Sequence, residues 1–94
     1  MGRNATRQEP GSSHFPTPED LEERFLILHN DEINTFRHVI KSLIDVCGHD
    51  PLQAEQCAFI THYTGRCDIR KGLYPVLKPL RDGLVRRGLQ VTID

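Results

Sequence analysis

Hydrophobic residues recur with two different periods along this chain, and each period predicts one type of element. The run RFLILH at residues 24–29 is apolar over four successive positions, which is typical of a strand buried on both faces. RCDIR at residues 66–70 and LQVTID at residues 89–94 alternate apolar with polar side chains, as expected of strands with one face toward water. The pattern therefore predicts three short strands.

Between the first two strands the apolar period changes to three and four residues, which indicates an amphipathic helix. Its apolar positions are Phe36, Val39, Ile40, Leu43, Ile44 and Cys47, and its opposite face is formed by Arg37, His38, Lys41, Ser42 and Asp45. Either Asn34 or Thr35 can accept from the first free amides as the N-cap. Gly48 can adopt the left-handed conformation that ends a helix, so both ends are specified locally.

A second helix is predicted to begin at Pro51 and to end near Tyr63. Asp50 is a suitable N-cap, proline is tolerated at the first helical position, and Gly65 can end the helix. One face carries small or partly polar residues, namely Ala54, Cys57, Ala58, Thr61 and His62. This face can approach another element closely.

A third helix is expected between the last two strands. Its apolar stripe consists of Val76, Leu77, Leu80 and Leu84, and its last turn carries Arg86 and Arg87 before Gly88. Pro79 lies inside this pattern and removes an amide donor. We therefore expect either a kink at Pro79 or a helix that begins late.

The order strand, helix, helix, strand, helix, strand predicts an α+β fold. The expected architecture is a small two-layer sandwich, with a three-stranded antiparallel sheet and three helices. Residues 1–23 are mostly polar and contain several prolines, so we predict a flexible N-terminal tail there. The folded domain is expected to span residues 24–94.

Composition narrows the class of protein. The 94 residues carry a formal net charge of -1 without clustered Lys and Arg, which argues against nucleic acid and against an anionic membrane as partners. No window is long and apolar enough to be a signal peptide or a membrane span, so a cytoplasmic protein is expected. Three cysteines, an odd number within periodic segments, indicate reduced thiols.

The segment LHNDEINTF at residues 28–36 places three side chains with acceptor oxygens in a row, Asn30, Asp31 and Glu32. Such a segment before a helix is commonly a turn and a helix cap. It can also be a site that binds a group rich in hydrogen-bond donors. The local pattern leaves both interpretations open.

Metal binding and catalysis are less well supported by the residues. Cys47, His49, Cys57 and His62 suggest zinc only superficially, because no Cys-x-x-Cys or His-x-x-x-His pair is present; no metal or other cofactor is expected. Asp31 and His62 could act as an acid-base pair. However, the sequence has no nucleophile motif, no phosphate-binding glycine loop and no paired catalytic carboxylates, so it is not expected to be an enzyme.

Three segments, FLILHNDEINTFRHVI, DPLQAEQCAFITHYTGR and GLQVTID, resemble the ClpS family. These adaptors deliver N-degron substrates to a Clp AAA+ unfoldase and its ClpP protease partner. The resemblance covers roughly residues 24–94 and is strongest in the Asn-acid-acid turn and in the helix that ends His-Tyr-x-Gly. It implies binding of a destabilising N-terminal residue, Phe, Tyr, Trp or Leu, on a substrate protein.

The resemblance places the contacts to the substrate's α-amino group at Asn30, Asp31 and His62. A buried ammonium group needs an acceptor for each of its N–H donors and a compensating negative charge, and these three side chains can supply both. The first side chain of the substrate would enter an apolar pocket. By similarity this pocket is lined by Ile33, Asn34, Phe36, Val39, Ala58, Thr61 and Leu89.

Several positions depart from the commoner family pattern. Phe36 and Ala58 stand where methionine is frequent, and Thr61 stands where valine is frequent, so we expect a deeper pocket with a narrower mouth and a bias toward large aromatic side chains.

In the family the unfoldase N-terminal domain docks on and beside the third helix. The usual glutamate and lysine there correspond to Pro75 and Leu80, which leaves Lys78 and Arg81 as candidate docking residues. The unfoldase can be of the ClpA or the ClpC type.

A purely structural interaction module is the alternative. The C-terminal domain of a ribosomal stalk protein shares this order of strands and helices but has no reason to bring amine acceptors together. Whether Asn30, Asp31 and His62 converge on one cavity therefore discriminates between the two interpretations.

Overall fold

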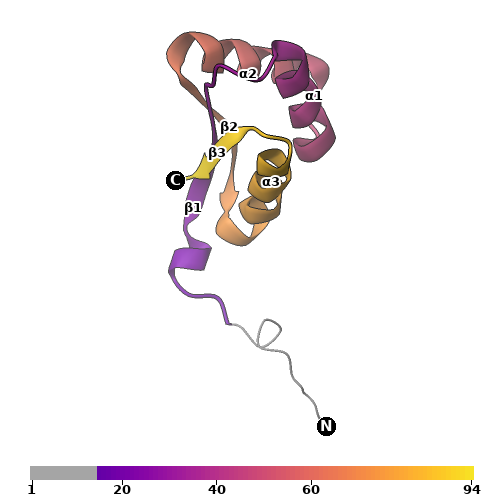
Figure 1. The fold of residues 1–94 in the computed structure, drawn as a ribbon. Helices are drawn as coiled ribbons and strands as arrows, with labels where there is room; N and C mark the ends of the chain where they lie inside the picture. Colours follow the sequence, from indigo (N-terminus) through magenta and orange to yellow (C-terminus); the bar gives the residue numbers. More distant parts are fainter. Residues whose placement is uncertain (1–14) are drawn as a thin grey trace.

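Strand β1 (Glu23–His29) is the central strand of an antiparallel sheet in the computed structural model, which describes residues 15–94 (Figure 1). It pairs with β2 (Arg66–Leu73) on one side and with β3 (Gln90–Ile93) on the other. Its residues 26–28 are all buried. Leu26 and Leu28 belong to the main core cluster, whereas Ile27, which points to the opposite face, is buried outside that cluster.

The predicted tail lies only partly within the described residues. Residues 1–14 lie outside them, and the described part before the sheet contains one short 3-10 turn, η2 (Glu19–Leu21). The Asp20 amide donates to Thr17 Oγ1 at 3.3 Å, while the Thr17 amide donates to Asp20 Oδ2 at 3.1 Å. This reciprocal pair specifies the turn locally.

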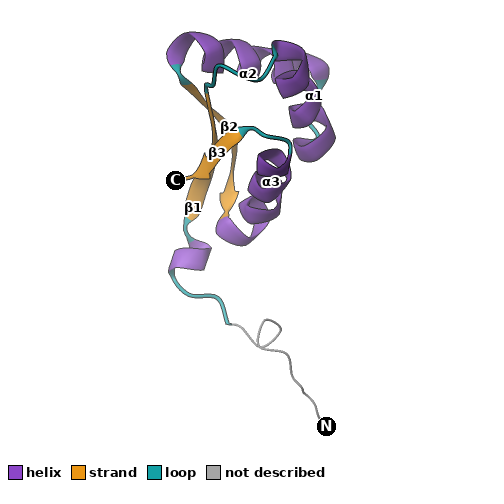
Figure 2. Ribbon diagram, in the orientation of Figure 1, coloured by secondary structure: helices purple, strands orange, loops and turns teal. Residues whose placement is uncertain are grey.

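Three helices complete the domain: α1 (Phe36–Cys47), α2 (Pro51–Thr64) and α3 (Tyr74–Arg86) (Figure 2). Helix α3 packs against all three strands and α2 packs against β2, whereas α1 contacts α2 and α3. The order β-α-α-β-α-β and the three-stranded antiparallel sheet confirm the predicted α+β class.

The helix ends follow the local signals in the sequence. Thr35, not Asn34, is the N-cap of α1, and its side chain accepts from the His38 amide at 3.1 Å. Asp50 caps α2 by accepting from the Gln53 amide at 3.0 Å. Gly48 and Gly65 end the two helices at φ values of 72° and 97°, which favour glycine over any residue with a Cβ.

The prediction that Ser42 lies on the polar face of α1 is wrong. Ser42 is fully buried, and its hydroxyl has no hydrogen-bond partner among residues 15–94. The reason is that α1 has two helical neighbours, and α3 approaches so closely that a Cβ on Gly83 would lie 2.9 Å from Val46 Cγ1. The apolar stripe read from the sequence accounts for one helical neighbour of α1, whereas the contacts with α2 and α3 together bury a wider part of its surface.

For the third helix we expected either a kink at Pro79 or a late start, and the late start is wrong. Helix α3 begins at Tyr74 and continues through Pro79. Pro75 stands near the first helical position, where a missing N–H removes no helical hydrogen bond. Pro79 has no amide to donate to the Pro75 carbonyl, and both prolines are exposed.

Cys47, Cys57 and Cys67 are free thiols buried in the core. Burial raises the pKa of all three, that of Cys67 to about 12. The thiols are therefore protonated near neutral pH and pack as small apolar side chains, in agreement with the predicted reduced state.

His49 provides a test of the fold through pH. Its Nε2 atom donates to the Ile69 carbonyl at 3.1 Å, and its buried Nδ1 has no partner among the described residues. Burial, and then the charge of Arg70, lowers the pKa of His49 below the value of about 6.5 found in unfolded chains. A folded pKa below the unfolded one means that the unfolded chain binds the proton first, so stability is lost as pH falls through about 6.5.

We predict that the free energy of unfolding, measured by urea denaturation, decreases between about pH 7 and about pH 5.5. His49→Gln keeps a side-chain N–H for the Ile69 carbonyl but cannot be protonated, so its profile over this range should be flatter. Equal slopes for the two proteins would contradict the role given to His49.

Candidate functional site

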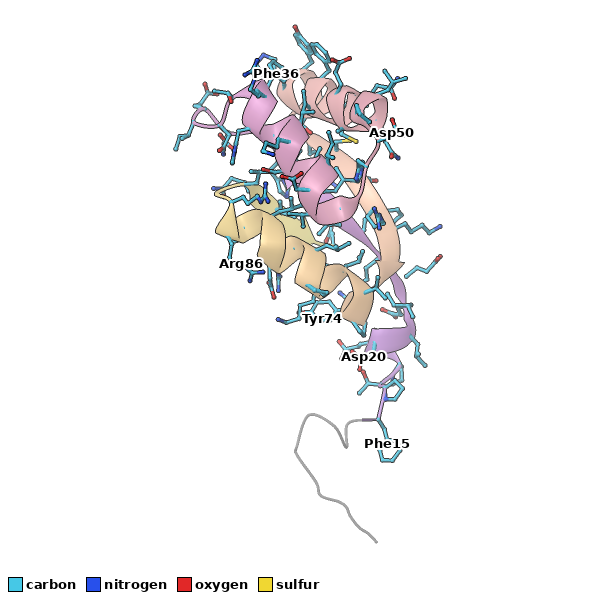
Figure 3. All side chains as sticks on the ribbon, turned by 90° about the vertical axis from the view of Figure 1, so that its right-hand side faces the viewer. Phe15, Asp20, Phe36, Asp50, Tyr74 and Arg86 are labelled. Carbon is cyan, nitrogen blue, oxygen red and sulfur yellow. The ribbon has the colours of Figure 1, made fainter. Side chains whose placement is uncertain are left out.

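A hollow lies where β1 ends, between the start of α1 and the last turns of α2. Its volume is about 390 Å³, counting the space open to solvent at its mouth. Figure 3 places Phe36 at the end of α1 that lies beside α2, at this position. The hollow is lined by Leu28, His29, Asn30, Asp31, Asn34, Phe36, Val39, Ala58, Thr61 and His62.

The loop of residues 30–34 is shaped by the carboxylate of Asp31. Its Oδ1 accepts from the backbone amides of Ile33 at 2.8 Å and Asn34 at 2.7 Å, and its Oδ2 accepts from Asn34 Nδ2 at 2.9 Å. The same Asn34 Nδ2 donates to the Gly88 carbonyl at 3.0 Å. The loop is thereby closed on itself and attached to the end of α3.

Asp31 is held in its charged form. Burial works against the ionised carboxyl, but the hydrogen bonds from Asn34 and Ile33 and the charge of His38 outweigh it and hold the pKa of Asp31 below its ordinary value. A carboxylate offers about four lone-pair positions, and the loop uses three of them. Asp31 therefore forms the turn and still presents a full negative charge with room for one more donor.

Asn30 follows β1 and His62 lies in the last turn of α2, and both side chains line the hollow together with Asp31. The Asn30 amide donates to the Gly65 carbonyl at 2.9 Å, which attaches the end of β1 to the end of α2. Within residues 15–94, neither the Asn30 carboxamide nor the His62 ring makes a hydrogen bond in the structure. One negative charge and two unoccupied polar side chains thus line a single hollow.

The rest of the lining is mostly apolar. Leu28 and Ala58 are buried, Val39 is half-buried, and Phe36 is 39% exposed at the rim. Thr61 is buried, and its hydroxyl donates to the Cys57 carbonyl at 2.8 Å, so its donor is already satisfied within α2. The hollow therefore has a polar part at the loop and an apolar part between α1 and α2.

Two residues from the predicted pocket do not line the hollow. The side chain of Ile33 is 88% exposed, and Leu89 is 2% exposed within the core. Leu28 and His29 line the hollow although they were not among the predicted residues. They are the last residues of β1 and immediately precede Asn30, and this adjacency is the sequence signal that could have identified them.

Lys78 and Arg81 lie on α3 and take no part in the hollow. Lys78 Nζ lies 2.9 Å from Asp82 Oδ2, and Arg81 Nε lies 2.9 Å from Asp82 Oδ1. The two cations therefore share one carboxylate.

The described part of the chain contains no group of three or more His, Cys, Asp or Glu side chains that could hold a metal ion. In the same residues, no helix combines the length and the hydropathy needed to cross a bilayer.

Comparison with known proteins relates the chain to adaptors of proteolysis. A family model described as "ATP-dependent Clp protease adaptor protein ClpS" matches residues 21–92. Among solved structures, ClpS2 from Agrobacterium tumefaciens bound to L-phenylalaninamide superposes with a TM-score of 0.67 at 12% sequence identity, over 79% of this chain and 96% of that one. No curated protein sequence gives a significant match.

The link between the loop and α3 can be tested with Asn34→Ala. This substitution removes the side-chain donor to Asp31 Oδ2 and to the Gly88 carbonyl, and should lower the free energy of unfolding by about 1 kcal/mol. Hydrogen exchange of the Ile33 amide, measured by NMR, should become faster. Glu32→Ala, an exposed change in the same loop, is the control; equal effects of the two substitutions would contradict the assigned role of Asn34.

Proposed function

Because the chain belongs to the ClpS family, we propose that it is an adaptor whose hollow binds the free α-amino group and the first side chain of N-degron substrates. The observation that carries the proposal is the convergence of Asn30, Asp31 and His62 on that hollow. These side chains come from the end of β1, the following loop and the end of α2. A structural module of the ribosomal stalk type would not need them to meet.

The polar part of the hollow matches the chemistry of an ammonium group. An N-terminal amine is a cation with three N–H donors, and removing it from water is unfavourable unless each donor finds an acceptor. Asp31 offers negative charge, Asn30 a carbonyl oxygen and His62 a ring nitrogen. An acetylated N-terminus has neither the charge nor these donors, so the same arrangement should reject it.

The apolar part suits the side chain of the first residue. Phenylalaninamide, the ligand in the Agrobacterium ClpS2 structure, combines a free amine with a phenyl ring. The hollow likewise has hydrogen-bond acceptors and apolar side chains in one lining, which supports binding of a free amine together with an apolar side chain here. Burying a large apolar side chain contributes roughly 1.5–3 kcal/mol.

The walls favour large aromatic first residues over leucine. Ala58 is a small residue in the buried part of the wall, which leaves depth for a ring. Phe36 at the rim is flat and stiffer than methionine, and its ring can pack against an entering ring. The proposed hierarchy therefore places Phe, Tyr and Trp above Leu.

Delivery to a Clp AAA+ unfoldase and its ClpP protease is the second part of the proposal. The chain then acts in the cytoplasm as an adaptor and not as an enzyme. Docking through α3 would place Lys78 and Arg81, with their shared Asp82, at the unfoldase N-terminal domain of the ClpA or ClpC type.

The amine contacts are tested by isothermal titration calorimetry with a peptide that begins with Phe. We expect binding by the free peptide and none by its N-acetylated form, and His62→Ala should weaken binding by about 1–3 kcal/mol. Equal binding of the acetylated peptide would exclude the proposed site.

The depth of the hollow is tested with Ala58→Met. The longer side chain should occupy the space meant for a ring and lower affinity for peptides beginning with Trp or Phe by about 1–3 kcal/mol, with a smaller effect on Leu. Ile60→Met, on the exposed face of the same helix, is the matched control. Tighter binding of Leu than of both aromatics by the unmodified protein would contradict the proposed preference.

A further inference from the structure

Four aromatic rings form one cluster beside the mouth of the hollow, and each ring contacts two of the others. We name them the aromatic shelf: Phe36 from α1, and Phe59, His62 and Tyr63 from α2. The Phe36 ring lies 5.1 Å from the ring of Phe59 and 5.1 Å from that of His62. The Phe59 and Tyr63 rings are stacked at 6.2 Å, and His62 meets Tyr63 edge-on at 4.9 Å.

The shelf is exposed to an extent that core packing does not explain. Phe36 is 39% exposed, Phe59 is 46% exposed and Tyr63 is 75% exposed. Adjacent aromatic side chains that remain in water form a contiguous apolar patch, and such patches mark binding surfaces. Phe59 and Tyr63 stack on each other near the end of α2, yet both side chains stay exposed.

The shelf is continuous with the hollow because two residues belong to both. Phe36 and His62 line the hollow, while Phe59 and Tyr63 do not. When the amine of a substrate is at Asn30, Asp31 and His62 and its first side chain is in the apolar part, the chain must leave across the rim. The second Cα then lies about 3.8 Å from the first, so a second side chain starts within reach of the shelf.

We therefore propose, on the basis of the function above, that the aromatic shelf is a subsite for the second residue of the substrate and that it selects an aromatic side chain there. Stacked and edge-on ring pairs are favourable beyond the area that they bury, and the shelf offers both a face and an edge. The substrate class is thus a free N-terminus that begins with two aromatic residues.

Charge around the shelf argues against an acidic second residue. Glu32 lies in the adjoining loop, and Glu55 precedes Phe59 by four residues on α2 and therefore shares its helix face. A carboxylate at the second position would meet these like charges and would not stack on the rings. An acidic second residue should consequently bind more weakly than alanine.

The test compares peptides that begin Phe-Trp, Phe-Ala and Phe-Asp, each with the same remaining sequence, by fluorescence anisotropy on the full chain. The unmodified protein should bind Phe-Trp about five- to tenfold more tightly than Phe-Ala, and Phe-Asp several-fold more weakly. Changing Phe59 and Tyr63 together to Ala should bring the ratio of Phe-Trp to Phe-Ala close to one while Phe-Ala binding persists. Because both side chains are exposed, the fold should be retained, and circular dichroism checks this.

Two further variants make the test specific. Phe59→Leu keeps an apolar side chain without a ring and should lose most of the preference for Trp. Ile60→Ala changes a neighbouring residue that is equally exposed, at 47%, and should keep the ratio of the unmodified protein. An unchanged ratio in the double variant, or an equal loss in Ile60→Ala, would overturn the shelf proposal even though Phe-Ala still bound. Failure of the unmodified protein to bind Phe-Ala would instead overturn the proposed function itself.

Discussion

The carboxylate of Asp31 is the interaction on which the site depends. Its three hydrogen bonds from residues 33 and 34 shape the loop. Asn34 Nδ2 also donates to the Gly88 carbonyl, which attaches the loop to the end of α3. The same hydrogen bonds keep Asp31 ionised. The carboxylate that we propose for a substrate amine therefore also anchors its own turn, so the structural and the binding interpretations of this motif are compatible.

The surrounding fold brings distant segments to that charge. Pairing of β1 with both neighbours fixes where the strand ends, and the hydrogen bond between the Asn30 amide and the Gly65 carbonyl sets the end of α2 beside it. His62 then lies near Asn30 although the two are far apart in sequence. The apolar walls from α1 and α2 complete the hollow. In the proposed function, charge recognition and ring burial act there on the same chain end, and selectivity for N-termini follows from requiring both.

Local signals predicted the elements well, and tertiary contacts account for what they missed. Thr35, Gly48 and Asp50 act through neighbours within a few residues, so the helix ends could be derived from sequence. The burial of Ser42 depends on the approach of α3 at Gly83, which no periodicity within α1 reports. Helix α3 continues through Pro79 against the local signal, which shows that one missing amide donor does not end this helix.

The candidate site divides in the same way. The resemblance to the ClpS family suggested that Asn30, Asp31 and His62 share one site, because the residues alone left a turn and a binding site both open; the structure places all three on one hollow. The exact wall was harder to predict: Ile33 turns outward after the loop closes on Asp31, while Leu89 packs in the core below the sheet's last strand. Side-chain direction in a loop is set by its hydrogen bonds, and these become visible only in the folded chain.

The most direct test of the convergence on Asp31 is an NMR titration with phenylalaninamide and with its N-acetylated form. We predict that the free amine shifts the side-chain amide signal of Asn30 and the ring signals of His62 together, at one common affinity, and that the acetylated compound shifts neither. Signals that respond at different concentrations, or that respond equally to the acetylated compound, would contradict a single amine-binding hollow.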